Sequence, residues 1–286
     1  MEISASQVKA FRDKTGLPMM DCKRALVEAE GDEDKAVEIL RKSGAKTMAG
    51  RTDRITQEGR IVVFTDKVKN VTAMIELLCE SEPVSNNAGF ESLANALAEQ
   101  LATGPGATTP EELLTQPFPN KSGVTLKQFL DELANKIREV FRLSRIARIE
   151  GNVSSYVHHN KHVAALLAID GLDSPTVRDI CMQVASMNPQ YFKIEDIDPS
   201  VVAKELEIQT KQAKQRNPNK PDNILQKIID GLMKTYYAER VLLAQPFIKD
   251  SSKTVQQVCN EAHIEIKKSI CWILGQEKCC VLGQEN

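Results

Sequence analysis

The sequence predicts an α+β protein, and three observations carry that prediction. A dense apolar run at Val71–Cys79 is typical of a strand covered on both faces, and Phe90–Ala102 then spaces apolar residues three and four apart, as one face of a helix does. The same order recurs at His162–Ile169 and Thr176–Met187. Between Asp198 and Glu239, two charged segments with narrow apolar seams predict an antiparallel helical hairpin. We therefore expect two related α+β halves with a hairpin inserted in the second.

Composition limits the classes of partner. The chain has 286 residues and a formal net charge of −2, so it lacks the overall basic field that attracts nucleic acid or anionic lipid. The sequence contains no apolar run long enough to cross a bilayer, and the N-terminus lacks the pattern of a signal peptide. We expect a soluble cytoplasmic protein with no direct nucleic-acid or membrane partner.

The seven cysteines do not form a metal-binding pattern. Cys22, Cys79 and Cys181 lie within apolar segments, which favours buried, reduced thiols. Cys279 and Cys280 stand near a polar C-terminus, where exposure and oxidation are expected. Without a Cys-x-x-Cys pair, a structural zinc site is not expected.

The first module, residues 1–45, carries the signals of three short helices. Ser4 and Gln7 form a capping-box pattern at the start of the first helix, and Gly16 ends it. Pro18 suits the first turn of the second helix, Asp32 caps the third, and Gly44 is expected to close the bundle.

So small a bundle cannot bury all its apolar side chains. Met19 and Met20, at the corner before the second helix, are candidates for an exposed docking patch, although one of them could instead fill the core. Arg12 lies one turn before this corner and could frame the patch or be a solvated charge.

The remaining boundaries follow from composition and periodicity. Residues 46–59 are polar and form an expected linker, 103–124 form an expected surface loop, and a helix is predicted at Leu126–Phe141. The predicted domains are the bundle 1–45, the linker 46–59, a first core subdomain 60–149, a second core subdomain 150–197 and 240–275, the hairpin 198–239, and a tail 276–286.

A cluster of arginines and a cluster of histidines are candidates for binding sites. Three arginines in Arg142–Arg148 could bind RNA, but no aromatic platform accompanies them, so a solvated sheet face is favoured. His158, His159 and His162 lack a nearby acidic or thiol partner, which favours a polar rim or contact surface over a metal site. The chain also lacks a phosphate-binding glycine loop and a nucleophile elbow. We expect no cofactor, no metal and no enzymatic activity.

The residues resemble one known family over nearly the whole chain, translation elongation factor Ts, the nucleotide exchange factor of elongation factor Tu. The most specific resemblance lies in Val8–Ala45, with support from the corner at Glu76–Phe90. The matching residues are Arg12, Thr15-Gly16, Met19-Met20-Asp21-Cys22-Lys23, Ala25-Leu26, Glu28-Ala29, Gly31-Asp32, Arg41-Lys42-Ser43-Gly44-Ala45, Glu150-Gly151, Ser155-Tyr156, His158, Gln245-Pro246-Phe247 and Ser252-Lys253-Thr254-Val255.

This resemblance implies a ubiquitin-associated-like N-terminal bundle, a two-subdomain core and a coiled-coil hairpin. It implies that the bundle docks on the GTPase through Arg12, Met19 and Met20, and that the core corner reaches the edge of the nucleotide site. The position matching His158 contacts another part of the partner in this family. The implied function is binding of elongation factor Tu with GDP and promotion of GDP release. An adaptor that binds other proteins through its bundle is the alternative.

One departure from the family lies at the core corner. The family's corner typically reads Thr-Asp-Phe-Val, with the aromatic ring inserted near the partner's magnesium site, whereas this chain reads Ser81-Glu82-Pro83-Val84. Glu82 keeps the negative charge, but Pro83 removes the aromatic ring. The resemblance therefore predicts the docking surfaces, but this chain lacks the aromatic ring that acts as a wedge in the family.

Overall fold

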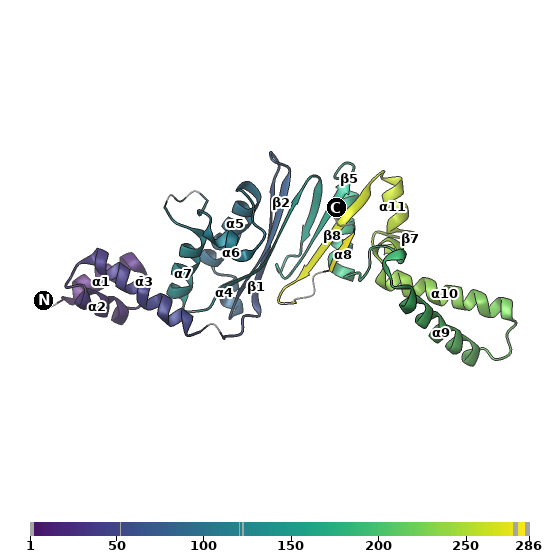
Figure 1. Cartoon of the computed structure of the whole chain (residues 1–286), viewed down its shortest axis with the longest axis horizontal. Helices are drawn as coiled ribbons and strands as arrows, with labels where there is room; N and C mark the ends of the chain where they lie inside the picture. The colour runs from purple at the N-terminus through teal and green to yellow at the C-terminus, as the bar shows by residue number, and fades with distance from the viewer. Residues whose placement is uncertain (1–2, 52, 120, 122, 277–279, 284–286) are drawn as a thin grey trace. The chain divides into compact units, whose positions relative to one another are not determined.

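The structure is a computed structural model that describes residues 3–51, 53–119, 121, 123–276 and 280–283. It has mixed α and β structure, as predicted, and divides into two compact units (Figure 1). The first unit comprises residues 1–66 and 73–148, and the second comprises 67–72 and 149–286. We describe each by itself.

The N-terminal bundle is formed by helices α1 (Ala5–Thr15), α2 (Met19–Glu28) and α3 (Glu33–Ala49). Its predicted caps are confirmed. Ser4 and Gln7 form a reciprocal capping box, and Gly16 adopts a left-handed conformation with φ of 68°. The Asp32 carboxylate accepts from the amides of Asp34 and Lys35 at 3.0 and 3.1 Å.

The bundle has a small core and one helix longer than predicted. The buried members of this core are Val8, Phe11, Cys22, Ala25, Leu26, Ala29, Ala36 and Leu40. The prediction that Gly44 closes the third helix is wrong, because α3 continues to Ala49. A Cβ added to Gly44 would lie 2.2 Å from Nδ2 of Asn135 on a later helix, so this glycine permits close packing and does not end the helix.

The rest of the first unit is a three-stranded sheet with four helices. The strands are β1 (Glu58–Asp66), β2 (Val71–Cys79) and β3 (Arg142–Glu150), in the order β1-β2-β3. The helices are α4 (Glu82–Ser85), α5 (Ala88–Thr103), α6 (Pro110–Thr115) and α7 (Leu126–Ile137). All nine residues of β2 are buried, as its apolar sequence predicts, and α5 packs against β1.

Three details of this unit differ from the prediction. The expected surface loop at 103–124 contains the helix α6, and α7 ends at Ile137, four residues before Phe141. The interpretation of the arginines in β3 as a solvated face is wrong for Arg145. Its side chain is only 16% exposed and pairs with the buried carboxylate of Glu76 at 2.8 Å, because a charge in a covered sheet requires a partner.

The second unit contains a four-stranded sheet in the order β4-β5-β8-β9. Its strands are β4 (Val153–Val157), β5 (Val163–Asp170), β8 (Glu265–Ile273) and β9 (Cys280–Gly283), and the neighbouring pairs are antiparallel. The unit also contains the helices α8 (Pro175–Met187) and α11 (Val255–Glu261) and the short strands β6 (Pro246–Phe247) and β7 (Asp250–Thr254). Short 3-10 helices lie at Ile194–Asp196 and Leu242–Ala244. The predicted order of buried strand, corner and helix thus recurs as β5 and α8.

The C-terminal segment was predicted only as a polar tail, yet β9 pairs with β8 from Lys268↔Gly283 to Cys271↔Cys280. Four residues carry little periodic signal, so pairing with a distant strand decides their conformation. The predicted exposure of Cys279 and Cys280 concerns side chains outside the described part of the chain.

The hairpin consists of α9 (Pro199–Arg216) and α10 (Asp222–Arg240), which pack against each other and project from the sheet of their own unit (Figure 1). Asp198 caps α9 by accepting from the amide of Ser200 at 2.7 Å. The seam and base of the hairpin bury Ile197, Ala213, Ile229, Met233, Tyr236 and Val241. The predicted antiparallel hairpin is therefore confirmed as a pair of helices.

Candidate partner-binding surfaces

The bundle presents an apolar corner at the start of α2. Met19 is 44% exposed and Met20 is 64% exposed, and neither belongs to the buried core of the bundle. The interpretation that one of them fills the core is therefore wrong. Arg12 is exposed on α1, before the turn that leads to this corner. We call Arg12, Met19 and Met20 the bundle patch.

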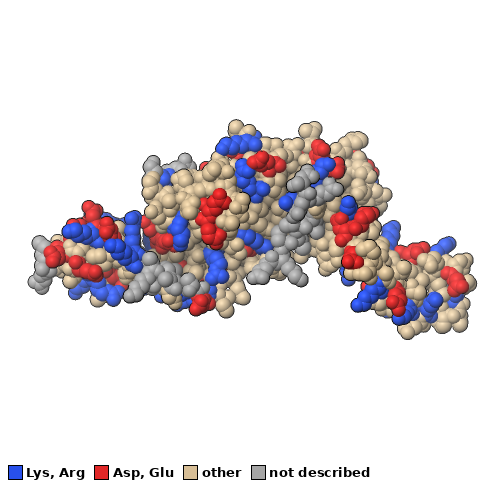
Figure 2. Space-filling view, in the orientation of Figure 1, with Lys and Arg blue, Asp and Glu red and all other residues tan. Residues whose placement is uncertain are grey.

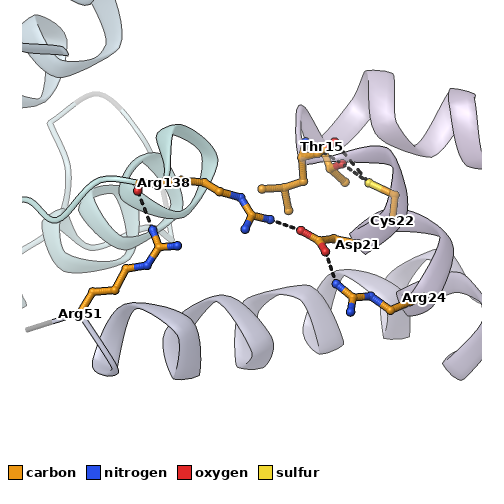
Figure 3. Close-up of polar contacts among 7 residues, drawn as sticks. Thr15, Asp21, Cys22, Arg24, Arg51 and Arg138 are labelled. Carbon is orange, nitrogen blue, oxygen red and sulfur yellow. Dashed lines mark hydrogen bonds and ion pairs between the residues drawn. The ribbon is translucent and has the colours of Figure 1, made fainter. Parts of the chain in front are cut away.

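Local hydrogen bonds hold the turn under the bundle patch. The hydroxyl of Thr15 lies 3.4 Å from the sulfur of Cys22 (Figure 3) and donates to the carbonyl of Phe11 at 3.0 Å. The Cys22 thiol donates to the carbonyl of Leu17 at 3.6 Å. Because Cys22 is fully buried, the first turn of α2 is anchored from inside, and the methionines before it are left outside.

The second surface is the core corner, Ser81–Val84. Ser81 precedes the short helix α4, and Pro83 lies in its first turn, where the missing amide donor of proline costs no helical hydrogen bond. Glu82 and Pro83 are exposed, Val84 is half-buried, and Ser85 is buried beneath them. The corner thus displays one carboxylate and one small apolar ring.

Contacts with the segment after α7 hold the core corner. The backbone amide and the hydroxyl of Ser81 both donate to the carboxylate of Glu139, at 3.1 and 2.6 Å. In the opposite direction, the amide of Val140 donates to Glu80 at 2.8 Å, and Arg54 donates to the other oxygen of Glu80 at 2.8 Å. We call this arrangement the carboxylate clasp.

The carboxylate clasp lowers the pKa of Glu80. Partial burial acts to raise the pKa of the Glu80 carboxyl, but the Val140 amide and the Arg54 guanidinium outweigh burial and hold the pKa below its ordinary value of 4.5. Glu80 is therefore ionised at neutral pH, when it is the stronger hydrogen-bond acceptor.

The carboxylate clasp was not predicted from the sequence. No role was assigned to Glu80 or Glu139 from the sequence, and the helix expected at Leu126–Phe141 covered Glu139. Acids that lie in turns directly after a strand and a helix are the only sequence signal, and that signal is weak.

The third predicted site residue, His158, belongs to the second unit. It follows β4, is half-buried, and its Nδ1 lies 3.0 Å from the hydroxyl of Tyr156. The rings of His158 and His159 are 4.3 Å apart. Within the described residues, His, Cys, Asp and Glu side chains form no group of three or more that could hold a metal ion.

Burial sets the chemistry of the thiols. The pKa is raised from 9.0 to about 12 at Cys79 and at Cys181, in both cases chiefly because burial disfavours the thiolate. Cys22, Cys79 and Cys181 are buried and free, as predicted. A buried thiol with a raised pKa is a poor nucleophile.

On the face seen in Figure 2, Lys and Arg side chains are interspersed with Asp and Glu side chains. Among the described residues, the structure has no helix that is both long and apolar enough to cross a membrane.

Several known proteins are similar to this chain over most of its length. The family described as Elongation factor TS matches residues 80–276. Elongation factor Ts of Aquifex aeolicus is 38% identical over 96% of this chain and 99% of its own length, and that of Hydrogenobaculum sp. is 37% identical over 93% and 97%. The protein of the same name from Corynebacterium urealyticum is 39% identical over 96% and 98%. Because these matches cover almost the full length of both chains, this chain belongs to the elongation factor Ts family.

Proposed function

We propose that this translation elongation factor is a guanine nucleotide exchange factor, which binds elongation factor Tu with GDP and promotes release of the GDP. It performs no bond chemistry of its own. The observation that carries this proposal is the core corner, where the carboxylate clasp holds Glu82 and Pro83 outward at a fixed place in a family member.

The physics of exchange requires surfaces of this kind. A GTPase holds its nucleotide through phosphate-loop amides, a lysine and Mg²⁺, and an exchange factor must bind more tightly the state in which those contacts are broken. Whatever affinity the factor removes from the nucleotide, the nucleotide removes from the factor in equal measure. A rigidly held corner suits this role because an ordered surface loses little conformational entropy on binding.

The bundle patch supplies a second contact in this proposal. Two exposed methionines offer an adaptable apolar surface to a helix of the GTPase, and the exposed Arg12 flanks them. The bundle is then a ubiquitin-associated-like module, the hairpin is a coiled-coil arm, and His158 makes the third contact. The cytoplasm is the compartment where such a factor would act.

The decisive experiment measures release of labelled GDP from the cognate elongation factor Tu. We expect release to accelerate with increasing concentration of this protein, and excess GDP with Mg²⁺ to dissociate the complex. Unchanged release at saturating protein would overturn the proposal. Retention of a different abundant protein from lysate, insensitive to GDP and Mg²⁺, would point instead to an adaptor.

A further inference from the structure

Three consecutive residues after α7 contact α2, next to the bundle patch, and the core corner. Arg138 donates to the carboxylate of Asp21, which lies on α2 directly after Met19 and Met20 (Figure 3). The next residue, Glu139, accepts from Ser81, and the amide of Val140 donates to Glu80. One short segment is therefore bonded on one side to α2, the helix that carries Met19 and Met20, and on the other to the core corner.

The backbone at Arg138 is unusual. Arg138 ends α7 in the left-handed conformation with φ of 68°, where glycine is the common residue because a Cβ is disfavoured there. The chain places a long charged side chain at this position, and its guanidinium reaches Asp21. The backbone carbonyl of Arg138 also accepts from Arg51 at 2.6 Å, so the segment that follows α3 is held at the same point (Figure 3).

Two ion pairs join the bundle to α7 and to the residue that follows it. Arg41 on α3 pairs with Glu132 on α7 at 2.7 Å, and both side chains are about half exposed or more. Arg138 is 42% exposed and Asp21 is 22% exposed. Exposed ion pairs of this kind are individually weak and are screened by salt. These two ion pairs can therefore open.

We infer that Arg138 is a positioning residue, whose ion pair with Asp21 fixes the bundle patch relative to the core corner so that both can engage one partner at once. This inference rests on the proposed function. If the bundle is free to rotate, only a fraction of molecules presents both surfaces correctly. The apparent dissociation constant for the partner is then the intrinsic constant divided by that fraction.

Two substitutions of Arg138 separate positioning from folding. Arg138→Gly removes the ion pair and suits the left-handed backbone better than arginine does. Arg138→Asp reverses the charge, and aspartate also tolerates this conformation. The control is Arg24→Gln, because Arg24 also donates to Asp21 but lies on the same helix and does not bridge to α7. The rescue variant combines Asp21→Arg with Arg138→Asp.

The first readout needs no GTPase. Trypsin cleavage after Arg51 and Arg54, which lie between α3 and β1, is followed by mass spectrometry on the full chain. We expect faster cleavage in both Arg138 variants, wild-type cleavage in Arg24→Gln, and recovery in the charge swap. Added salt should speed cleavage of the wild type more than that of Arg138→Gly. Equal rates in all proteins would overturn the inference.

The second readout is stimulated GDP release over a range of protein concentrations. In Arg138→Gly we expect the concentration for half-maximal stimulation to rise about two- to fivefold, the range that an exposed ion pair allows, with an unchanged plateau. The charge swap should restore the wild-type value. If the wild type stimulates release and Arg138→Gly matches it at every concentration, the inference fails while the proposed function stands. If the wild type does not stimulate release, the proposed function fails, and the cleavage result alone decides whether Arg138 orients the bundle.

Discussion

Ser81 and Glu139 are joined by two hydrogen bonds, from the amide at 3.1 Å and from the hydroxyl at 2.6 Å, across 58 positions of sequence. This pair closes one side of the carboxylate clasp. Because both acceptor oxygens belong to a carboxylate, the two bonds are stronger than those between neutral groups. The shape of the core corner therefore depends on a residue outside the corner.

The first prediction concerns this pair. Glu139→Ala should lower the free energy of unfolding by about 1.5–3 kcal/mol, because two donors of Ser81 lose a charged acceptor. Ser81→Ala keeps the amide bond and should cost less. In a double-mutant cycle followed by urea unfolding, the coupling energy between the Ser81 and Glu139 changes should exceed about 0.5 kcal/mol.

Asp131→Ala, which removes an exposed carboxylate on α7, is the control for Glu139→Ala and should change the free energy of unfolding by less than about 0.5 kcal/mol. Strictly additive effects of the Ser81 and Glu139 changes would contradict the clasp.

The second prediction concerns Pro83. Pro83→Phe should accelerate GDP release, because a larger ring placed near the nucleotide site displaces more of the partner. A fully buried Phe side chain is worth about 1.5–3 kcal/mol, and if half of that is gained only in the nucleotide-free complex, release should speed up by about three- to tenfold.

Stopped-flow fluorescence of labelled GDP measures this effect at saturating protein. Pro83→Ala is the control that removes the proline ring without adding an aromatic one, and it should be no faster than the wild type. Slower release with Pro83→Phe would show that the corner does not act as a wedge in this chain.

The third prediction tests the bundle patch. Met20→Asp should weaken the complex with elongation factor Tu by about tenfold or more, because a carboxylate replaces a 64% exposed apolar side chain at the predicted contact. Met19→Asp should act in the same direction. Titration calorimetry gives the affinities, and thermal melts by circular dichroism should remain within about 2 °C of the wild type.

Val27→Asp is the matched control for these variants. Val27 is 53% exposed on the same helix but lies outside the bundle patch, so its substitution should leave the affinity near the wild-type value. Equal losses at Val27 and Met20 would mean that the charge acts through the whole helix and not through a specific patch.

The fourth prediction is a pH dependence. Folding lowers the pKa of Glu80 below 4.5, so its contribution to stability is fully present above that pH and is lost as the pH falls through the folded-state pKa. At neutral pH, the free energy of unfolding of the wild type should exceed that of Glu80→Gln by about 1–2 kcal/mol. Urea unfolding at a series of decreasing pH values should show this difference shrinking only in the acidic range.

Glu82→Gln is the control, because Glu82 is an exposed neighbour outside the clasp. Its free energy of unfolding should stay close to that of the wild type at every pH. A Glu80 difference that is independent of pH would exclude the ionised clasp.

The fifth prediction concerns the thiols. Cys22, Cys79, Cys181 and Cys259 are free and buried, Cys271 is buried as well, and burial raises the pKa of Cys259 to about 11. In a variant with Cys279→Ser and Cys280→Ser, a thiol reagent at mildly alkaline pH should react slowly with the native chain and rapidly with five thiols after denaturation. A rapidly reacting thiol in the native state would contradict the burial of these cysteines.

Several features of this protein could be predicted from sequence because short stretches encode them. The capping box at Ser4, the left-handed turn at Gly16 and the cap at Asp32 each depend on residues within four positions of one another. The buried strand β2 follows from the density of its apolar residues. The same local logic failed at Gly44, where a residue that often ends helices is used for close packing against Asn135.

The sequence by itself determined the α+β class, the helices of the bundle, and the order of strand and helix in each core unit. Only the tertiary structure decided which residues hold the candidate surfaces: Glu139 meets Ser81 across 58 positions, and Arg138 meets Asp21 across 117. Periodicity and capping act over a few residues, whereas an ion pair between distant segments exists only after the chain has folded and has no periodic signature in the sequence.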